Sequence, residues 1–337
     1  MSPRLTFYPT LTLGMLALAA CGETTTPTQP DVAGNPSAAL AAAAAANTWT
    51  PKAAPPFDQY IYGYVLGMAP NPAGESIVYA FGGTSSDDGS TGSTVKAYNA
   101  ATDTWTSKLS RALIFYSNGV SKIGNKLYFP GGYINAGNLP DATNALWAYD
   151  YSNDRMIRKA PLPIYSAEGV SGVINGKLYV LPGACNGNGY PNAGYCAEEQ
   201  TTHFYRYDPV TNTWATRHSA PHFHRRGAAA VINGKFYVAG GIAGFDTPVT
   251  ALDVYDPATK SWRTLASIPK GGSASGVSVN GKFYVVAPGR TYAYNPVTNQ
   301  WQIKAAPQIS GSVVKVGLAG GYYLFTAAGN QSALYTP

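Results

Sequence analysis

The sequence is poor in charge, in basic runs and in helical periodicity. Only 12% of its 337 residues are charged, and no basic run is longer than Arg225-Arg226. The net charge of +6 therefore indicates mild attraction to anionic surfaces or glycans and argues against nucleic-acid binding. Because amphipathic helical patterns are nearly absent beyond the N-terminus, the pattern favours an all-β protein.

The sequence also lacks an apolar run long enough for a convincing membrane span. Residues 1–20 instead combine the positive charge of Arg4 with a short apolar segment, which predicts a secretion signal peptide. The segment leads into Leu-Ala-Ala-Cys at positions 18–21, which resembles the lipobox of bacterial lipoproteins. An ordinary signal peptide followed by a chance cysteine is the alternative.

The lipobox resemblance implies a lipid anchor in the bacterial cell envelope. In such lipoproteins the signal peptide is cleaved before the cysteine, so Cys21 would be acylated, as with palmitate, on its thiol and its new amine. Gly22 follows instead of the aspartate that retains lipoproteins at the inner membrane, which implies the outer membrane, facing the periplasm or the exterior, in a cell with two membranes. Residues 21–46 are expected to form a disordered Thr-, Pro- and Ala-rich tether, because they cannot bury a core.

Glycine and tyrosine are abundant, with 37 and 25 residues, and both recur in a repeat. Its clearest copy spans residues 233–262 and starts with Asn233-Gly234, a pair suited to a type I′ hairpin turn. A β-prone apolar segment, a Gly-Gly pair and two further strand-like segments follow, the last containing Trp262. This pattern resembles the Kelch repeat, in which each copy forms one four-stranded blade of a β-propeller.

Six copies of the repeat are recognised, and the sixth stops before its Trp-containing strand. Residues 47–56, which include Trp49, carry the missing strand pattern at the other end of the chain. The prediction for residues 47–337 is therefore an all-β, six-bladed Kelch-type β-propeller whose ring is closed by the N-terminal strand (residues 47–56) in the last blade. The second-strand tyrosines that anchor the copies are Tyr79, Tyr128, Tyr179, Tyr237, Tyr284 and Tyr323.

Later strands of the copies repeat a second aromatic pair, exemplified by Tyr207 and Trp214. These aromatics could be platforms for a ligand. Their recurrence at one structural position in successive copies instead favours a place in the core.

Cysteine and histidine give few candidates for chemistry. Cys185 and Cys196 flank a polar loop, and in an oxidising compartment a disulfide between them is favoured over a metal site. His222 and His224 would lie on one side of an extended segment and, with His218 as a helper, are weak candidates for zinc or copper. We expect no metal and no cofactor.

Alignment of the copies places a set of polar residues at one mouth of the central channel, because in Kelch proteins the start of the innermost strand commonly faces it. Glu168 and Arg226 occupy this position in two adjacent copies. A polyhydroxylated ligand with a carboxylate would suit such a mouth, whereas a solvated ion pair between the two residues is the alternative. The other candidates are the hydroxyl residues Ser117, Ser273 and Ser312 at the same position, and Tyr116 and Tyr165 near it in sequence.

Three functions fit this sequence. The first is a membrane-tethered, monomeric and non-enzymatic module that binds a glycan or an envelope protein. The second is a sugar-acid mutarotase or epimerase similar to the Kelch proteins that act on sialic acid, with Glu168 transferring protons while Arg226 holds the carboxylate. The third is a structural envelope protein that docks between partners. The binding module is favoured because it needs only rigid blades and variable loops.

Overall fold

The computed structural model describes most of the chain beyond residue 46. The chain divides into two units, Met1–Asn35 and Pro36–Pro337, and the described residues all belong to the second. The signal peptide, Cys21 and the tether therefore lie outside the described residues, as does the loop with both remaining cysteines. Throughout the described part, no helix has the length and apolar character that a membrane crossing requires. The described ranges are 47–56, 61–85, 93–112, 116–135, 140–183, 202–244, 246–287, 289–307, 313–317, 323–327 and 331–337.

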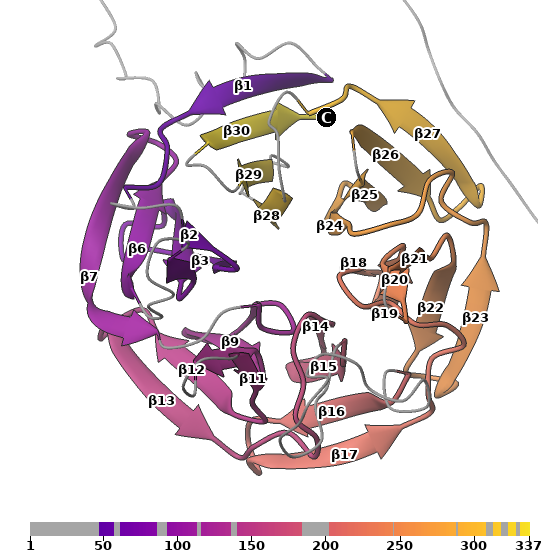
Figure 1. Ribbon diagram of the computed structural model, residues 1–337, viewed down its shortest axis with the longest axis horizontal. Coiled ribbons are helices and arrows are strands. Elements are labelled where there is room, and N and C mark those ends of the chain that lie inside the picture. The colour runs from indigo at the N-terminus through magenta and orange to yellow at the C-terminus, as the bar shows by residue number, and fades with distance from the viewer. Residues whose placement is uncertain are drawn as a thin grey trace, which may run out of the picture. The chain divides into compact units, whose positions relative to one another are not determined.

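Five blades are each formed by four strands in chain order, paired from the centre of the ring outward. Figure 1 shows these sheets arranged in a ring around a common centre. In chain order the five blades consist of β3 (Val65–Pro70), β4 (Ser76–Phe81), β6 (Ser93–Asn99) and β7 (Thr104–Ala112); β8 (Ser121–Ile123), β9 (Lys126–Pro130), β12 (Leu146–Asp150) and β13 (Arg155–Lys159); β14 (Val170–Ile174), β15 (Lys177–Leu181), β16 (Phe204–Asp208) and β17 (Thr213–Arg217); β18 (Ala228–Ile232), β19 (Lys235–Ala239), β22 (Leu252–Asp256) and β23 (Ser261–Leu265); and β24 (Ser275–Val279), β25 (Lys282–Ala287), β26 (Arg290–Asn295) and β27 (Gln300–Lys304).

Three two-stranded ribbons extend loops of the first, second and fourth blades. They pair β2 (Ile61–Tyr62) with β5 (Thr84–Ser85), β10 (Tyr133–Asn135) with β11 (Pro140–Ala142), and β20 (Ile242–Ala243) with β21 (Thr247–Pro248).

A further four-stranded sheet joins the two ends of the described chain (Figure 1). Its outer strand is β1, which pairs antiparallel with β30 from Thr48 opposite Thr336 to Lys52 opposite Ser332. The N-terminal strand thus lies where the sequence predicted it. The strands of this sheet are β28 (Val313–Gly317), β29 (Tyr323–Ala327), β30 (Gln331–Thr336) and β1 (Thr48–Lys52).

The predicted blade count requires a correction. The sequence predicted six equivalent blades, whereas five blades are continuous in sequence and have described cores. The closing sheet differs from them because β1 is held by strand pairing between the two chain ends and not by a turn from the preceding strand. Side chains of its inner strands β28 and β29 lie outside the described residues. The propeller therefore has five complete blades and a composite closing sheet.

The innermost strands complete the ring. Each contacts the innermost strands of the two neighbouring sheets, and β28 contacts β3, so that the cycle is closed. Every sheet therefore has a neighbouring sheet on both sides, which is how propeller blades cover their apolar faces.

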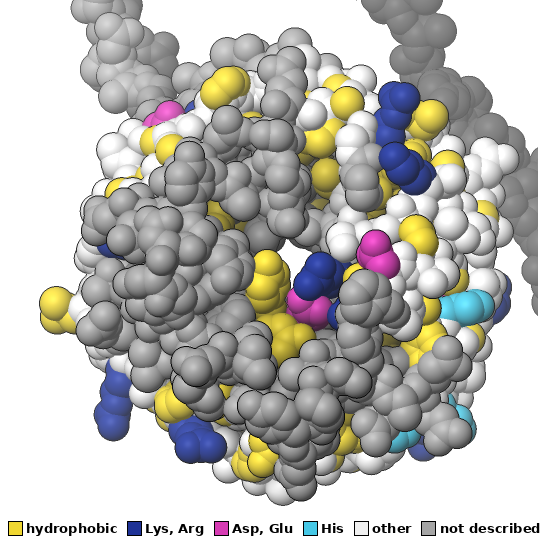
Figure 2. Space-filling model, viewed as in Figure 1, with side chains coloured by type: hydrophobic (Ala, Val, Ile, Leu, Met, Phe, Trp, Pro, Cys, Tyr) yellow, Lys and Arg dark blue, Asp and Glu magenta, His cyan; other side chains and the backbone are white. Residues whose placement is uncertain are grey.

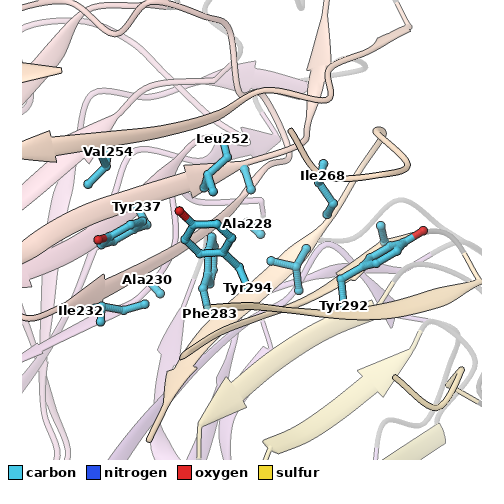
Figure 3. Close-up of a cluster of buried hydrophobic side chains, with 13 residues drawn as sticks. Ala228, Ala230, Ile232, Tyr237, Leu252, Val254, Ile268, Phe283, Tyr292 and Tyr294 are labelled. Carbon is cyan, nitrogen blue, oxygen red and sulfur yellow. The ribbon is translucent and has the colours of Figure 1, made fainter. Parts of the chain in front are cut away.

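The hydrophobic core lies between neighbouring sheets. Figure 3 shows one such cluster, in which Leu252 of β22 and Phe283 of β25 are both fully buried. Full burial of a side chain of this size stabilises the folded state by about 1.5–3 kcal/mol. The prediction that the repeated aromatics form the core is confirmed for the third-strand tyrosines, each less than 2% exposed: Tyr98, Tyr149, Tyr207, Tyr255, Tyr294 and Tyr335.

A repeated set of hydrogen bonds ties one blade to the next. Asn212 accepts a bond from the Tyr207 hydroxyl (2.6 Å) and another from the backbone N–H of Ala160 in the preceding blade (2.9 Å). The indole N–H of Trp214 donates to the Ala160 carbonyl (2.9 Å). Asn212 has a φ of +55°, a left-handed conformation that asparagine tolerates better than most residues.

The closing sheet makes the same three bonds. Asn47 accepts from the Tyr335 hydroxyl (2.8 Å) and from the backbone N–H of Ala305 (2.9 Å), and the indole N–H of Trp49 donates to the Ala305 carbonyl (3.1 Å). Strand β1 therefore reproduces the hydrogen bonds of a continuous blade.

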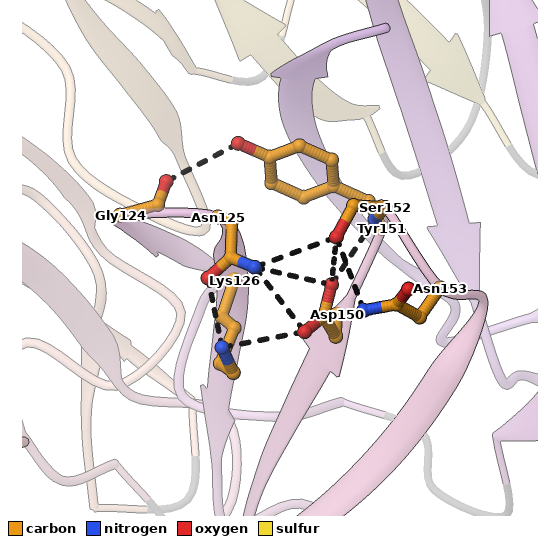
Figure 4. A network of polar contacts seen from close by, with 7 residues as sticks. All are labelled: Gly124, Asn125, Lys126, Asp150, Tyr151, Ser152 and Asn153. Carbon is orange, nitrogen blue, oxygen red and sulfur yellow. Dashed lines mark hydrogen bonds and ion pairs between the residues drawn. The ribbon is translucent and has the colours of Figure 1, made fainter. Parts of the chain in front are cut away.

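In the second blade, polar side chains link the turn between β8 and β9 to the turn between β12 and β13. In Figure 4, Lys126 Nζ lies 3.3 Å from Asp150 Oδ2, and the Ser152 hydroxyl donates to Asp150 Oδ1 (2.5 Å). Asn125 also donates to this carboxylate. Although burial opposes ionisation, the bonds from Ser152 and Lys126 lower the pKa of Asp150 to about 2. The network thus connects β9, β12 and the turn after β12.

Candidate binding site at the channel mouth

The candidate site is formed where the innermost strands start, because backbone hydrogen bonds connect these points from blade to blade. The Tyr116 N–H donates to the Gly63 carbonyl (2.6 Å), and the Glu168 N–H donates to the Tyr116 carbonyl (2.8 Å). The Arg226 N–H donates to the Glu168 carbonyl (2.7 Å), and the Ala274 N–H donates to the Arg226 carbonyl (2.8 Å). Five successive blades therefore place one residue each beside the next around the channel.

Three of these residues hold a backbone conformation that side chains disfavour. Tyr116, Glu168 and Arg226 have φ values of +49°, +59° and +56°. Gly63, with φ +72°, occupies the corresponding position before β3. The left-handed conformation costs a non-glycine residue about 1–2 kcal/mol. Glycine would adopt this backbone conformation without strain at all four positions. The presence of Tyr116, Glu168 and Arg226 at three of them therefore suggests that their side chains are needed there.

Glu168 and Arg226 form an ion pair across a blade boundary. Arg226 Nε lies 2.8 Å from Glu168 Oε1, and Nη2 contacts the same oxygen. Arg225 Nη1 lies 3.4 Å from Glu168 Oε2. The Glu168 side chain is 2% exposed and that of Arg226 is 44% exposed, so the carboxylate is enclosed while the guanidinium faces solvent. Burial alone would lower the pKa of Arg226, but the bond to Glu168 raises it.

The Tyr116 ring packs against the Arg226 guanidinium. Arg226 Cζ lies 5.7 Å from the centroid of the Tyr116 ring, within cation–π range. The ring lies over Gly63, where an added Cβ would be 2.7 Å from it, so a larger residue there would displace the ring. Tyr133 approaches the same ring edge-on, with the centroids 6.4 Å apart. Figure 2 shows hydrophobic, basic and acidic side chains meeting at the central opening.

The structure brings Tyr116, Glu168 and Arg226 together but not all of the predicted mouth residues. Ser117 is 5% exposed and donates its hydroxyl to the Gly119 carbonyl (2.9 Å), so it closes its own turn. Tyr165 and Ser273 are exposed and make no described contact with the ion pair, and Ser312 lies outside the described residues.

Asn118 explains why the mouth position shifts by one residue in this blade. It is fully buried, and its Oδ1 accepts from the Gly169 N–H (2.7 Å) while its Nδ2 donates to the Ser166 carbonyl (3.2 Å). Anchoring Asn118 between two blades places Tyr116, not Ser117, beside Glu168. Sequence alignment missed Asn118 because the other copies give no signal for a buried amide at this point.

The histidines predicted as weak metal candidates surround a carboxylate. His222 Nδ1 lies 2.9 Å and His224 Nε2 lies 3.1 Å from Asp253 Oδ2, while His224 Nδ1 lies 2.8 Å from the Gly240 carbonyl. Both ring nitrogens of His224 are thus occupied by hydrogen bonds. His218 contributes its carbonyl to a tryptophan of the next blade. Within the described ranges, no group of three or more His, Cys, Asp or Glu side chains could hold a metal ion.

Comparison with known proteins agrees with this architecture. Residues 225–269 match the family model of the Kelch motif. The chain is similar to human Kelch repeat and BTB domain-containing protein 12, with 28% identity over 179 residues, which is 49% of this chain and 28% of that protein. It is 33% identical over 178 residues to Kelch-like protein 15 of Danio rerio, covering 48% of this chain and 28% of that protein. The matched regions thus span less than a third of these relatives.

A solved structure titled "Structure of YjhT" has a similar fold. It aligns with a TM-score of 0.61 and 15% sequence identity, covering 83% of this chain and 98% of that chain. At this identity the likeness concerns the fold alone.

Proposed function

We propose, on the premise that this chain is a Kelch-repeat β-propeller, that it is a binding module whose channel mouth receives an anionic group of a glycan or protein partner. The fold is consistent with protein binding, since rigid blades position variable loops. The observation that carries the proposal is the strained backbone at Tyr116, Glu168 and Arg226. Local strain of this kind concentrates at functional sites, where side-chain placement matters more than backbone comfort.

The mouth has the chemistry for a carboxylate. Two guanidinium groups share one carboxylate, so this cluster carries one positive charge in excess. The exposed guanidinium of Arg226 is held in place by Glu168 and can donate to a ligand carboxylate in a planar fork. The Tyr116 ring, which packs against this guanidinium, adds partly exposed aromatic surface beside it.

The proposal includes the location inferred from the lipobox resemblance. A lipid on Cys21 and a tether up to residue 46 would hold a monomeric propeller at the envelope, in the outer membrane of a cell with two membranes. Such a tether would leave the propeller free to meet a glycan or envelope protein.

A sugar-acid mutarotase is the second candidate, because a carboxylate and a guanidinium share the mouth. Ring opening requires a group that takes a proton from the anomeric hydroxyl and a donor for the ring oxygen. Both Glu168 oxygens face arginine side chains, which favours a positioning role over proton transfer. NMR measurement of anomer exchange separates the two: catalysis that is lost in Glu168→Gln would replace the binding proposal with this one.

The binding proposal is tested with thermal-shift titrations of the purified protein against sugar acids, neutral sugars and acidic peptides. We expect carboxylate ligands to raise the Tm and Arg226→Lys to weaken binding by about tenfold, because a hydrogen bond to a charged group contributes about 1.5 kcal/mol. Arg217→Lys on the outer strand β17 is the matched control and should bind normally. Equal affinity in Arg226→Lys and the control would show that the mouth is not the binding site. Capture of an envelope protein without competition by sugars would favour a structural docking role.

A further inference from the structure

The segment that presents Arg226 is a tight turn. The Gly227 N–H donates to the His224 carbonyl (2.9 Å), which makes Arg225 and Arg226 the two central residues. Arg226 is therefore the third residue of the turn, with φ +56°, a position where a positive φ is usually supplied by glycine or asparagine. An arginine here needs an external restraint, since the turn could otherwise relax to a negative φ and withdraw the side chain from Glu168.

His224, the first residue of that turn, is held from two sides. Its Nδ1 lies 2.8 Å from the Gly240 carbonyl, and its Nε2 lies 3.1 Å from Asp253 Oδ2. The His224 and Asp253 side chains are both 0% exposed. Asp253 is itself fixed by the Thr264 hydroxyl, which donates to Oδ1 (2.7 Å). The turn is thus attached through an imidazole to β22 and to the end of β19.

The two contacts of His224 determine where protons must be. A carbonyl oxygen only accepts, so Nδ1 carries a hydrogen. The carboxylate of Asp253 also only accepts when ionised, and Nε2 then carries a hydrogen as well. The His224 ring is therefore held between the Gly240 carbonyl and the Asp253 carboxylate, a buried contact that restrains the turn while both partners are present.

We infer that His224, anchored by Asp253, is a positioning residue that keeps Arg226 in its strained conformation at the channel mouth. The restraint itself is argued from geometry, and only its role in binding a ligand at the channel mouth rests on the proposed function. Among the described residues, His222 is an ionisable group that contacts the pair, with its Nδ1 2.9 Å from the same Asp253 oxygen, whereas Arg225, which follows His224, faces Glu168.

A double-mutant cycle on stability tests the inference without any ligand. Glycine adopts a positive φ freely, so Arg226→Gly removes the need for a restraint. We expect His224→Gln to lower the Tm in the native background and to lose about half or more of that effect in the Arg226→Gly background. His222→Gln is the matched control, because it contacts the same carboxylate from the exposed side and should be additive. Additivity for His224→Gln as well would overturn the inference.

A spectroscopic signature gives an independent readout. The Nε–H signal of Arg226, assigned by its absence in Arg226→Lys, reports the bond to Glu168 and should shift or broaden in His224→Gln. If that variant does not fold, Asp253→Asn retains the imidazole and should change the same signal. An unchanged signal in a folded variant contradicts the positioning role. A protein that binds no carboxylate but loses this signal would refute the proposed function and leave the inference standing.

Discussion

At the scale of single residues, the mouth depends on a carboxylate that is nearly inaccessible to water. Glu168 is 2% exposed and has one arginine against each oxygen. Breaking such a pair leaves charged partners without compensation, which destabilises a protein more than the pair itself stabilises it. The mouth is therefore part of the structure as well as a candidate site.

Replacing Glu168 with glutamine should lower the free energy of unfolding by about 2 kcal/mol, because two partly buried guanidinium groups would face a neutral amide. Urea denaturation measures the change. Asp246→Asn removes the same charge at an exposed position and should have an effect within about 0.5 kcal/mol of zero. Equal stability of the two variants would mean that the arginines are well solvated without Glu168.

Sequence reasoning found the ion pair but not the geometry that makes it a site. Glu168 and Arg226 align because their copies have the same length between the start of the inner strand and the hairpin turn. Tyr116 was placed only near the mouth, since nothing in a tyrosine signals a positive φ. Asn118 shifts its blade by one residue through hydrogen bonds to a neighbouring blade, and such long-range contacts are not visible in a local pattern.

At the scale of the strand and turn, the turn residue before the outer strand of the fourth blade differs from its counterparts in the other blades. The turn before each outer strand holds a residue with positive φ, usually asparagine or aspartate, and in β17's turn Asn212 joins its own blade to the preceding one. Lys260 stands at this position before β23, with φ +56°, and has no side-chain oxygen to accept these bonds.

Lys260→Asn should therefore raise the free energy of unfolding by about 1 kcal/mol. Asparagine tolerates the left-handed conformation, and its carbonyl can accept from the Tyr255 hydroxyl as Asn212 accepts from Tyr207. Lys260→Ala, which lacks the acceptor, is the matched control. Chemical denaturation that finds the two variants equal would show that the fourth blade is locked in another way.

The turn network of the second blade gives a pH-dependent prediction. Burial raises the pKa of Asp150, but bonds from Ser152 and Lys126 outweigh it and bring the pKa to about 2. Its pKa in the folded state is thus below the unfolded value, so the stabilisation is present above about pH 4 and is lost as the pH falls towards 2. Denaturation curves between pH 2 and 5 should show this fall in the native protein and a shallower one in Asp150→Asn. Parallel pH profiles would contradict the assignment of the shift to this network.

At the scale of the whole propeller, the repeat predicted a closed ring, but it did not show that the closing sheet is built differently from the other blades. The Tyr and Trp periodicity predicted four-stranded blades and the N-terminal strand that completes the last sheet, but the predicted count of six equivalent blades is wrong. Five blades are continuous and the closing sheet is composite: the other blades have both strand pairing and a turn between their two outer strands, whereas β1 and β30 are joined by pairing alone. A sequence pattern records that a strand is missing but not how strongly its substitute is attached.

Removal of β1 should consequently open the ring rather than trim it. A chain without residues 47–52 would lose the antiparallel pairing with β30, the Trp49–Ala305 bond and the Asn47 bonds, and would expose a strand edge that favours association with other chains. We expect size-exclusion chromatography to show oligomers and urea denaturation to show a lower midpoint. A synthetic peptide of residues 47–56 should restore the monomer, because it can occupy the β30 edge.

Point variants measure the strength of the closure while keeping the chain intact. Trp49→Ala and Trp214→Ala remove the same indole bond, one from the composite sheet and one from a continuous blade. Each should cost about 2–3 kcal/mol, somewhat below the usual range for a fully buried tryptophan, since both rings are half-buried. If β1 is attached as firmly as a covalently joined strand, the two losses are equal. A much smaller loss for Trp49→Ala, together with a truncated chain that stays monomeric and equally stable, would show that the ring is held by its inner strands and that β1 is dispensable.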